Sequence, residues 1–234
     1  NTITRAQSDN TNASSLTFDV VFSENISNVD IGDFALNRTG SANGTISAIS
    51  GSGSTYTVTV SGVTGAGTLG LDLNSAGTGI IDSASNAITA GFTASQTYTV
   101  DRVAPSVSSI VPAGSASTNG TSSSYTVTFS ENVSGVDISD FTITSTNSAT
   151  ANVASISGSG NVYTIVVDNI DGDGTLRLDL KSSGTGIIDT FGNPISAGFT
   201  SGSVITVDRI APTLALPIAI SDNALIIDET STIT

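Results

Sequence analysis

The sequence predicts an all-β protein built from two tandem β-sandwiches, and three observations support this. Apolar and polar residues alternate over short runs, as in Tyr125–Phe129, which reads YTVTF. Alternation with a period of two, in runs rich in Thr, Val, Tyr and Ile, is typical of half-buried strands. Clusters of Gly, Asn, Asp and Ser, which favour turns, separate these runs. No segment shows the 3.6-residue apolar stripe of an amphipathic helix.

One block of sequence occurs twice, at an offset of 107 residues. FSENISNVDIGDF begins at Phe22, and FSENVSGVDISDF begins at Phe129. The same offset relates TVDRVAP at Thr99 to TVDRIAP at Thr206 without a gap, and the prolines there discourage helix just before them. We therefore expect one immunoglobulin-like repeat at 1–103 with its opening residues trimmed (repeat one), a second at 104–210 (repeat two), and the opening of a third at 211–234. The chain is then expected to be a piece of a longer protein.

The elements of repeat two follow from its alternation. Strands are expected, in chain order, at 106–111, 124–130, 138–144, 152–157, 162–167, 175–180 and 203–207. About seven short strands in about 100 residues are typical of an immunoglobulin-like sandwich. A barrel or a β-solenoid is the alternative.

Composition excludes several kinds of site. The 234 residues carry a net charge of −14 and include one lysine but no Cys, His, Met or Trp. A disulfide framework, a thiolate or imidazole metal site and a Ser-His-Asp triad are therefore excluded. The acidic balance argues against nucleic acid as a partner, and no apolar run approaches the roughly 20 residues of a membrane span. A hard cation such as calcium suits this charge better.

Acidic residues recur where the loops of a sandwich would meet the preceding repeat. In a seven-strand sandwich the B–C loop, the F–G loop and the entering linker lie at one end, so their carboxylates would repel one another there. Calcium, which binds about six to eight oxygens, would resolve this repulsion. The predicted ligands at the junction are Asp101, Glu131, Asp137 and Asp189, with Asn193 completing the set, and their equivalents in repeat one are Glu24, Asp30 and Asp82.

An alternative without metal remains open for these residues. Asp137 and Asp189 would cap backbone N–H groups in turns, and Glu131 would pair with Arg102. A separate stretch, DNIDGDG from Asp168, offers Asp171 and Asp173 as ligands of a second calcium ion. Its alternative is a tight glycine turn with solvated aspartates.

The ordered motifs FSE, GSGxxYTVxV, GxGTLxLxL, GIxDxxGN and TVDRxAP resemble those of bacterial immunoglobulin-like repeats. Such repeats occur in tandem in very large secreted or surface-anchored proteins, including calcium-dependent biofilm adhesins. The resemblance implies an extracellular location at the bacterial cell surface and a spacer role, often with calcium at the joints. One departure lies in repeat one, which reads DSASN from Asp82 where repeat two reads DTFGN from Asp189.

The expected function is that of a non-enzymatic extender in cell adhesion, whose partners are neighbouring repeats of the same chain. A carboxylate pair of the glycosidase type would lack a Trp platform for sugar. One alternative is a self-assembling filament or surface-layer subunit, associating through 213–234. The other is carbohydrate or receptor binding by the loops, where Phe191 is the candidate aromatic contact, although filling the junction is the expected role of this side chain.

Overall fold

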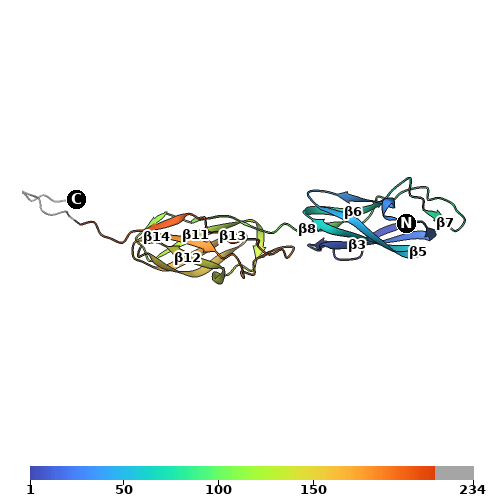
Figure 1. The fold of residues 1–234 in the computed structure, drawn as a ribbon. Helices are drawn as coiled ribbons and strands as arrows, with labels where there is room; N and C mark the ends of the chain where they lie inside the picture. The colour runs from blue at the N-terminus through green and yellow to red at the C-terminus, as the bar shows by residue number, and fades with distance from the viewer. Residues whose placement is uncertain (214–234) are drawn as a thin grey trace, which may run out of the picture.

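The computed structural model describes residues 1–213 and contains two β-sandwiches placed end to end (Figure 1). The predicted all-β, immunoglobulin-like class is confirmed. The chain passes from one sandwich to the other directly after β8 (Tyr98–Asp101). The short helices in the described residues are not long or apolar enough to cross a membrane. The part of the expected third repeat beyond residue 213, including the proposed assembly segment, lies outside the described residues.

The strands of repeat one form two sheets of four strands each. The first has the order β1-β3-β5, with β7 also pairing β3, and the second has the order β2-β8-β6-β4. The elements before β8 are β1 (Thr2–Arg5), β2 (Asn10–Thr11), β3 (Ser15–Ser27), η1 (Ile31–Asp33), β4 (Phe34–Arg38), β5 (Asn43–Thr64), β6 (Ala66–Leu73) and β7 (Ile81–Asp82).

Repeat two has the same arrangement. One sheet has the order β13-β11-β15 with β9 also pairing β11, and the other has the order β10-β16-β14-β12. The elements are β9 (Val107–Pro112), β10 (Ser117–Thr118), β11 (Ser122–Ser134), η2 (Ile138–Asp140), β12 (Phe141–Ser145), β13 (Thr150–Asp171), β14 (Gly174–Leu180), β15 (Ile188–Asp189) and β16 (Val204–Val207).

Each repeat encloses its own apolar core, formed by the inward-facing residues of the alternating runs. Tyr125, Val127 and Phe129 are fully buried in repeat two, as the alternation predicts. Phe129 packs edge-to-face on Tyr163, with ring centroids 5.8 Å apart. Phe22 and Tyr56 make the equivalent contact in repeat one, at 5.9 Å. The repeated sequence thus specifies a repeated core.

The observed elements differ from the strands expected from sequence in three respects. The third strand begins at Phe141 rather than at 138, because Asp137 and Asp140 form a capping box that makes 138–140 a 3₁₀ helix. The strands expected at 152–157 and 162–167 both lie in β13. This strand folds back at Gly158 (φ 115°), where an added Cβ would lie 2.5 Å from the Val162 carbonyl oxygen. The two-residue strands β10 and β15 were not predicted, because they are too short to show a period.

The sheets β10-β16-β14-β12 and β2-β8-β6-β4 differ in how each holds an aspartate whose carboxylate is at least partly buried. In repeat two, Arg177 Nε donates to Asp179 at 2.6 Å and Thr144 Oγ1 donates to it at 2.5 Å. Burial acts to raise the pKa of Asp179, but these bonds outweigh it and hold the pKa below its usual value. In repeat one the equivalent of Arg177 is Gly70. There Asp72 keeps a buried oxygen without a hydrogen-bond partner among the described residues, and burial raises its pKa.

Candidate metal centre

Three carboxylates from separate segments meet where repeat one joins repeat two. Asp101 is the last residue of β8, Glu131 lies in β11, and Asp189 lies in β15. One oxygen from each side chain lies within 4.8 Å of the other two. Asp189 is buried, and the other two residues are partly buried. The group, here called the junction cluster, therefore joins one residue of repeat one to two of repeat two.

A bulge in β11 positions Glu131. The pairing of β11 with β13 shifts register between Thr128 and Val133, and such bulges redirect side chains from their regular alternation. Tyr163 on the facing strand donates its hydroxyl to the Val133 carbonyl at 2.9 Å and fixes the end of the bulge. Just before Glu131, Ser130 N donates to the Ser106 carbonyl at 2.8 Å, and Ser106 N donates to Ser130 Oγ at 3.0 Å. Ser106, in the segment through which the chain enters repeat two, is thus held beside Ser130, the residue that precedes Glu131.

The turn that follows β15 positions Asp189. Its Oδ1 accepts the backbone N–H groups of Phe191 and Asn193, both at 2.8 Å. Its Oδ2 accepts from Asn193 Nδ2 at 2.7 Å. Asn193 Nδ2 also donates to the Asp101 carbonyl at 3.0 Å. One amide group thus connects the side chain of Asp189 to the backbone of repeat one.

No cation compensates the junction cluster among the described residues. The ion pairs of residues 1–213 lie elsewhere and join Arg5 to Asp9, Arg177 to Asp179, and Arg209 to Asp171. The alternative pairing of Glu131 with Arg102 is wrong, because the Arg102 guanidinium donates to the Asn12 carbonyl of repeat one instead.

The surroundings of Glu131 favour its protonated form. Burial, followed by the negative charges of Asp189 and Asp101, raises its pKa above the usual value. The donor set at the junction consists of oxygen atoms alone and carries concentrated negative charge. These properties fit a hard divalent cation such as calcium.

The raised pKa of Glu131 gives a pH prediction for the calcium-free protein. A carboxyl whose pKa is higher when folded than when unfolded opposes folding once it ionises, so its penalty develops as pH rises above the usual value of 4.5. We expect Glu131→Gln and wild type to be equally stable at about pH 4, and the variant to be the more stable at about pH 7. Urea unfolding in chelator at both pH values measures this difference. A constant difference would contradict the assigned electrostatics.

The structure does not bring Asp137 to the junction cluster. Its Oδ1 accepts from Ser139 N at 2.7 Å and from Ser139 Oγ at 2.6 Å, so it caps η2. These bonds lower its pKa. Asp30 caps η1 in the same way, accepting from Gly32 N at 2.7 Å. The capping alternative describes Asp137 well, whereas Asp189 both caps a turn and belongs to the cluster.

The remaining predicted ligands lie at the two far ends of the molecule. Asp173 accepts from Arg209 N at 2.7 Å, and Asp171 lies 3.7 Å from the Arg209 guanidinium. Among residues 1–213, no third acidic side chain joins these two. Glu24 and Asp82 line a pocket at the opposite end of repeat one. Metal binding by any of these residues stays a prediction.

Sequence reasoning missed the hydrogen bonds that hold the junction together. Tyr163, Ser106 and Ser130 were not singled out, although Ser130 directly precedes Glu131 in the repeated phrase. Asn193, expected as a ligand, donates its amide hydrogens to the Asp101 carbonyl and to Asp189 Oδ2 at the seam, the contact between the two repeats. The repetition of Ser23 as Ser130 and of Asn86 as Asn193 was the available signal.

Comparison with known protein families gives a match for one stretch of the chain. Residues 101–207 match the family model of the bacterial Ig-like domain. Bacterial Ig-like domains are generally structural rather than enzymatic, and they occur in surface and extracellular proteins of bacteria. The match begins at Asp101, so it includes all three residues of the junction cluster. No curated protein matches the chain.

Proposed function

We propose that the two repeats are an extracellular spacer and that a calcium ion bound by the junction cluster stiffens the joint between them. The observation that carries the proposal is the meeting of Asp101 from repeat one with Glu131 and Asp189 from repeat two within 4.8 Å. A cation held by all three would cross-link the repeats. Their mutual repulsion would otherwise favour separation of the two sides.

The hydrogen bonds across the seam support a defined joint. Asn193 Nδ2 donates to the Asp101 carbonyl across the seam, and next to it, within repeat two, Ser196 N donates to the Pro105 carbonyl at 3.4 Å. These few bonds leave the linker around Val103 half exposed. Two domains are expected to move relative to each other when the interface between them is small and polar. Calcium would supply electrostatic energy that the protein's own contacts lack.

An acidic rod with stiff joints suits the role of an extender in a bacterial adhesin. It would hold a distant binding domain away from the cell, and the family match of repeat two supports a structural role at the surface. Among the alternatives, loop-mediated binding gains little support from Phe191, because this residue, in the turn that Asp189 caps, is partly buried.

Chelation is expected to loosen the joint. In calcium the chain should show the maximum dimension of an extended two-domain rod by small-angle X-ray scattering. In chelator the average dimension should shorten, because bent arrangements become populated. The double variant Glu131→Gln, Asp189→Asn should show the loosened profile in both buffers. Identical wild-type profiles with and without calcium would contradict a stiffening ion.

A further inference from the structure

An asparagine-glycine pair of repeat one lies at the surface, beside the place where β4 passes into β5. Asn43 is the first residue of β5, and its side chain is exposed. Arg38 is the last residue of β4, and residues 39–42 join the two strands. Arg38 and Gly44 also line an open groove of about 480 Å³ between β4 and β5. Water therefore reaches the pair.

Two hydrogen bonds converge on the side-chain oxygen of Asn43. Gly44 N, the next backbone nitrogen, donates to Asn43 Oδ1 at 2.9 Å. The guanidinium group of Arg38 donates to the same oxygen. The first bond brings the nitrogen beside the side-chain amide, and the second brings a positive charge to the amide oxygen. None of the ion pairs of residues 1–213 involves Arg38, so this charge is directed at Asn43 alone.

Glycine at position 44 leaves the backbone nitrogen unshielded. A Cβ at this position would lie 2.8 Å from Val60 Cγ1, which is closer than side chains pack. The core beneath β5 therefore favours a residue without a side chain here, although Gly44 itself is only partly buried. The nitrogen next to Asn43 thus has no neighbouring Cβ that would hinder its approach to the amide carbon.

This arrangement suits closure of a five-membered ring. When Gly44 N loses its proton to hydroxide, it attacks Asn43 Cγ, and the charge of the new bond passes to Oδ1, where Arg38 faces it. A donor positioned where negative charge develops stabilises the transition state. The Cγ–Nδ2 bond then breaks, and Nδ2 takes a proton from water and leaves as ammonia, which regenerates the hydroxide. Water opens the succinimide at either carbonyl and yields aspartate or isoaspartate.

We propose that Asn43 is a site of self-modification, at which the side chain cyclises onto Gly44 with Arg38 as the assisting cation and water as the co-reactant. The product carries a carboxylate in place of the amide, so the groove gains a negative charge beside Arg38. Isoaspartate also extends the backbone by a methylene group at the start of β5. The modification belongs to repeat one alone and is independent of calcium at the junction.

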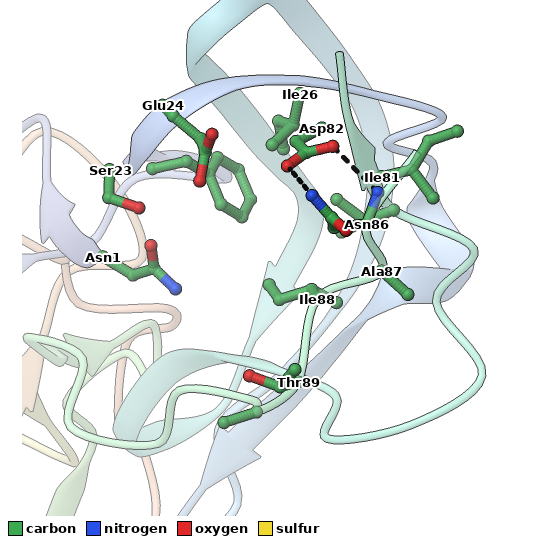
Figure 2. Close-up of a pocket in the computed structure, with 13 residues that line it drawn as sticks. Asn1, Ser23, Glu24, Ile26, Ile81, Asp82, Asn86, Ala87, Ile88 and Thr89 are labelled. Carbon is green, nitrogen blue, oxygen red and sulfur yellow. Dashed lines mark hydrogen bonds between the residues drawn. The ribbon is translucent and has the colours of Figure 1, made fainter. Parts of the chain in front are cut away.

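The other asparagine-glycine pair of the chain, Asn119–Gly120, is arranged differently. Gly120 N donates to Thr118 Oγ1 at 3.0 Å instead of to the asparagine side chain. Asn86 shows a third arrangement, in which its own Nδ2 donates to Asp82 Oδ2 at 2.8 Å (Figure 2). Two identical sequence pairs are therefore expected to react at different rates in the folded protein.

Peptide mapping by mass spectrometry, during incubation of the whole chain in mildly alkaline buffer, measures the loss of each asparagine. In the folded protein Asn43 should be lost about tenfold faster than Asn119, because only Asn43 is held against the attacking nitrogen. In concentrated urea the two rates should agree within about threefold, since only the shared sequence remains. Equal rates in the folded protein, or aspartate without isoaspartate at position 43, would overturn the proposal.

Variants of Arg38 test the assisting charge. Arg38→Met keeps the length of the side chain but removes the cation, so it should slow the loss of Asn43 about tenfold and leave Asn119 unchanged. Arg38→Lys should restore most of the rate, which a purely structural role of the guanidinium does not predict. In urea neither variant should have an effect. An unchanged rate in folded Arg38→Met contradicts the assignment.

Repeat two offers the reverse experiment, because Ser145, Thr150 and Ala151 stand at the three equivalent positions. The double variant Thr150→Asn, Ala151→Gly supplies the pair without the cation and should react about as slowly as Asn119. Adding Ser145→Arg should then raise the rate about tenfold. No gain from Ser145→Arg would show that the pair reacts without help from the charge and would overturn the proposal.

Discussion

Replacing Glu131 by Gln should weaken calcium binding at the junction by about 100-fold or more, as measured by isothermal titration calorimetry. The variant keeps the size and the bulge-defined position of the side chain, but it removes one of three negative charges. Losing even an outer partner of a metal ligand typically costs about 10- to 100-fold in affinity, and losing a charged ligand should cost at least as much.

The matched control is Glu24→Gln. Glu24 occupies the same position of the repeated phrase, but it is exposed and belongs to no group of three carboxylates among the described residues. It should leave the affinity of the junction unchanged. Equal affinities for Glu131→Gln and wild type would exclude Glu131 as a ligand, and equal losses in both variants would place the ion elsewhere.

Replacing Asp189 by Ala should destabilise repeat two even without calcium, by about 3 kcal/mol. The side chain is 3% exposed, and its two oxygens accept three N–H groups of the turn at 191–193. Each buried donor left without a partner costs about 1–3 kcal/mol, although partial rearrangement of the turn recovers some of this energy. Urea unfolding in chelator, monitored for repeat two, measures the loss.

The matched variant is Asp82→Ala, which removes the same hydrogen bonds from Ala84, Asn86 and the Asn86 amide in repeat one. That turn is exposed, so water replaces the lost acceptor and the loss should be smaller. Asp189→Ala and Glu131→Gln are therefore expected to differ in sign in chelator near neutral pH, since Glu131→Gln relieves repulsion. A small effect of Asp189→Ala would show that the turn does not depend on its cap.

The fold class could be predicted from the sequence because the same series of alternating apolar and polar runs occurs in both repeats. Alternation predicted that Tyr125, Val127 and Phe129 lie in the core, and the repeat at an offset of 107 residues showed most of the expected strands a second time. Alternation could not reveal where a capped 3₁₀ helix replaces the start of an expected strand. The run at 138–144 alternates correctly, yet Asp137 and Asp140 bind backbone N–H groups that a strand would need, and the strand starts later.

The junction cluster could be predicted only in part for a related reason. The topology of a sandwich determines which loops share an end, so Asp101, Glu131 and Asp189 were correctly expected to be neighbours. It does not determine where a side chain points within its loop. Asp137 lies only six residues after Glu131 but turns toward η2. The donor role of Asn193 depends on the path of the linker backbone, which residue types alone do not specify.

The parallel pairing of β10 with β16 has a consequence for how the protein would bear tension. The chain enters repeat two through β9, which pairs with β11, continues into β10 and leaves through β16; Ser117 of β10 pairs with Thr206 of β16, and Thr118 pairs with Val207. Once β9 has separated from β11, pulling on the two ends slides β10 and β16 past each other lengthwise. The bonds that Thr206 N and Asp208 N donate to the Ala116 and Thr118 carbonyls would share the load and rupture together instead of unzipping singly. The equivalent pair β2–β8 gives repeat one the same resistance to shear.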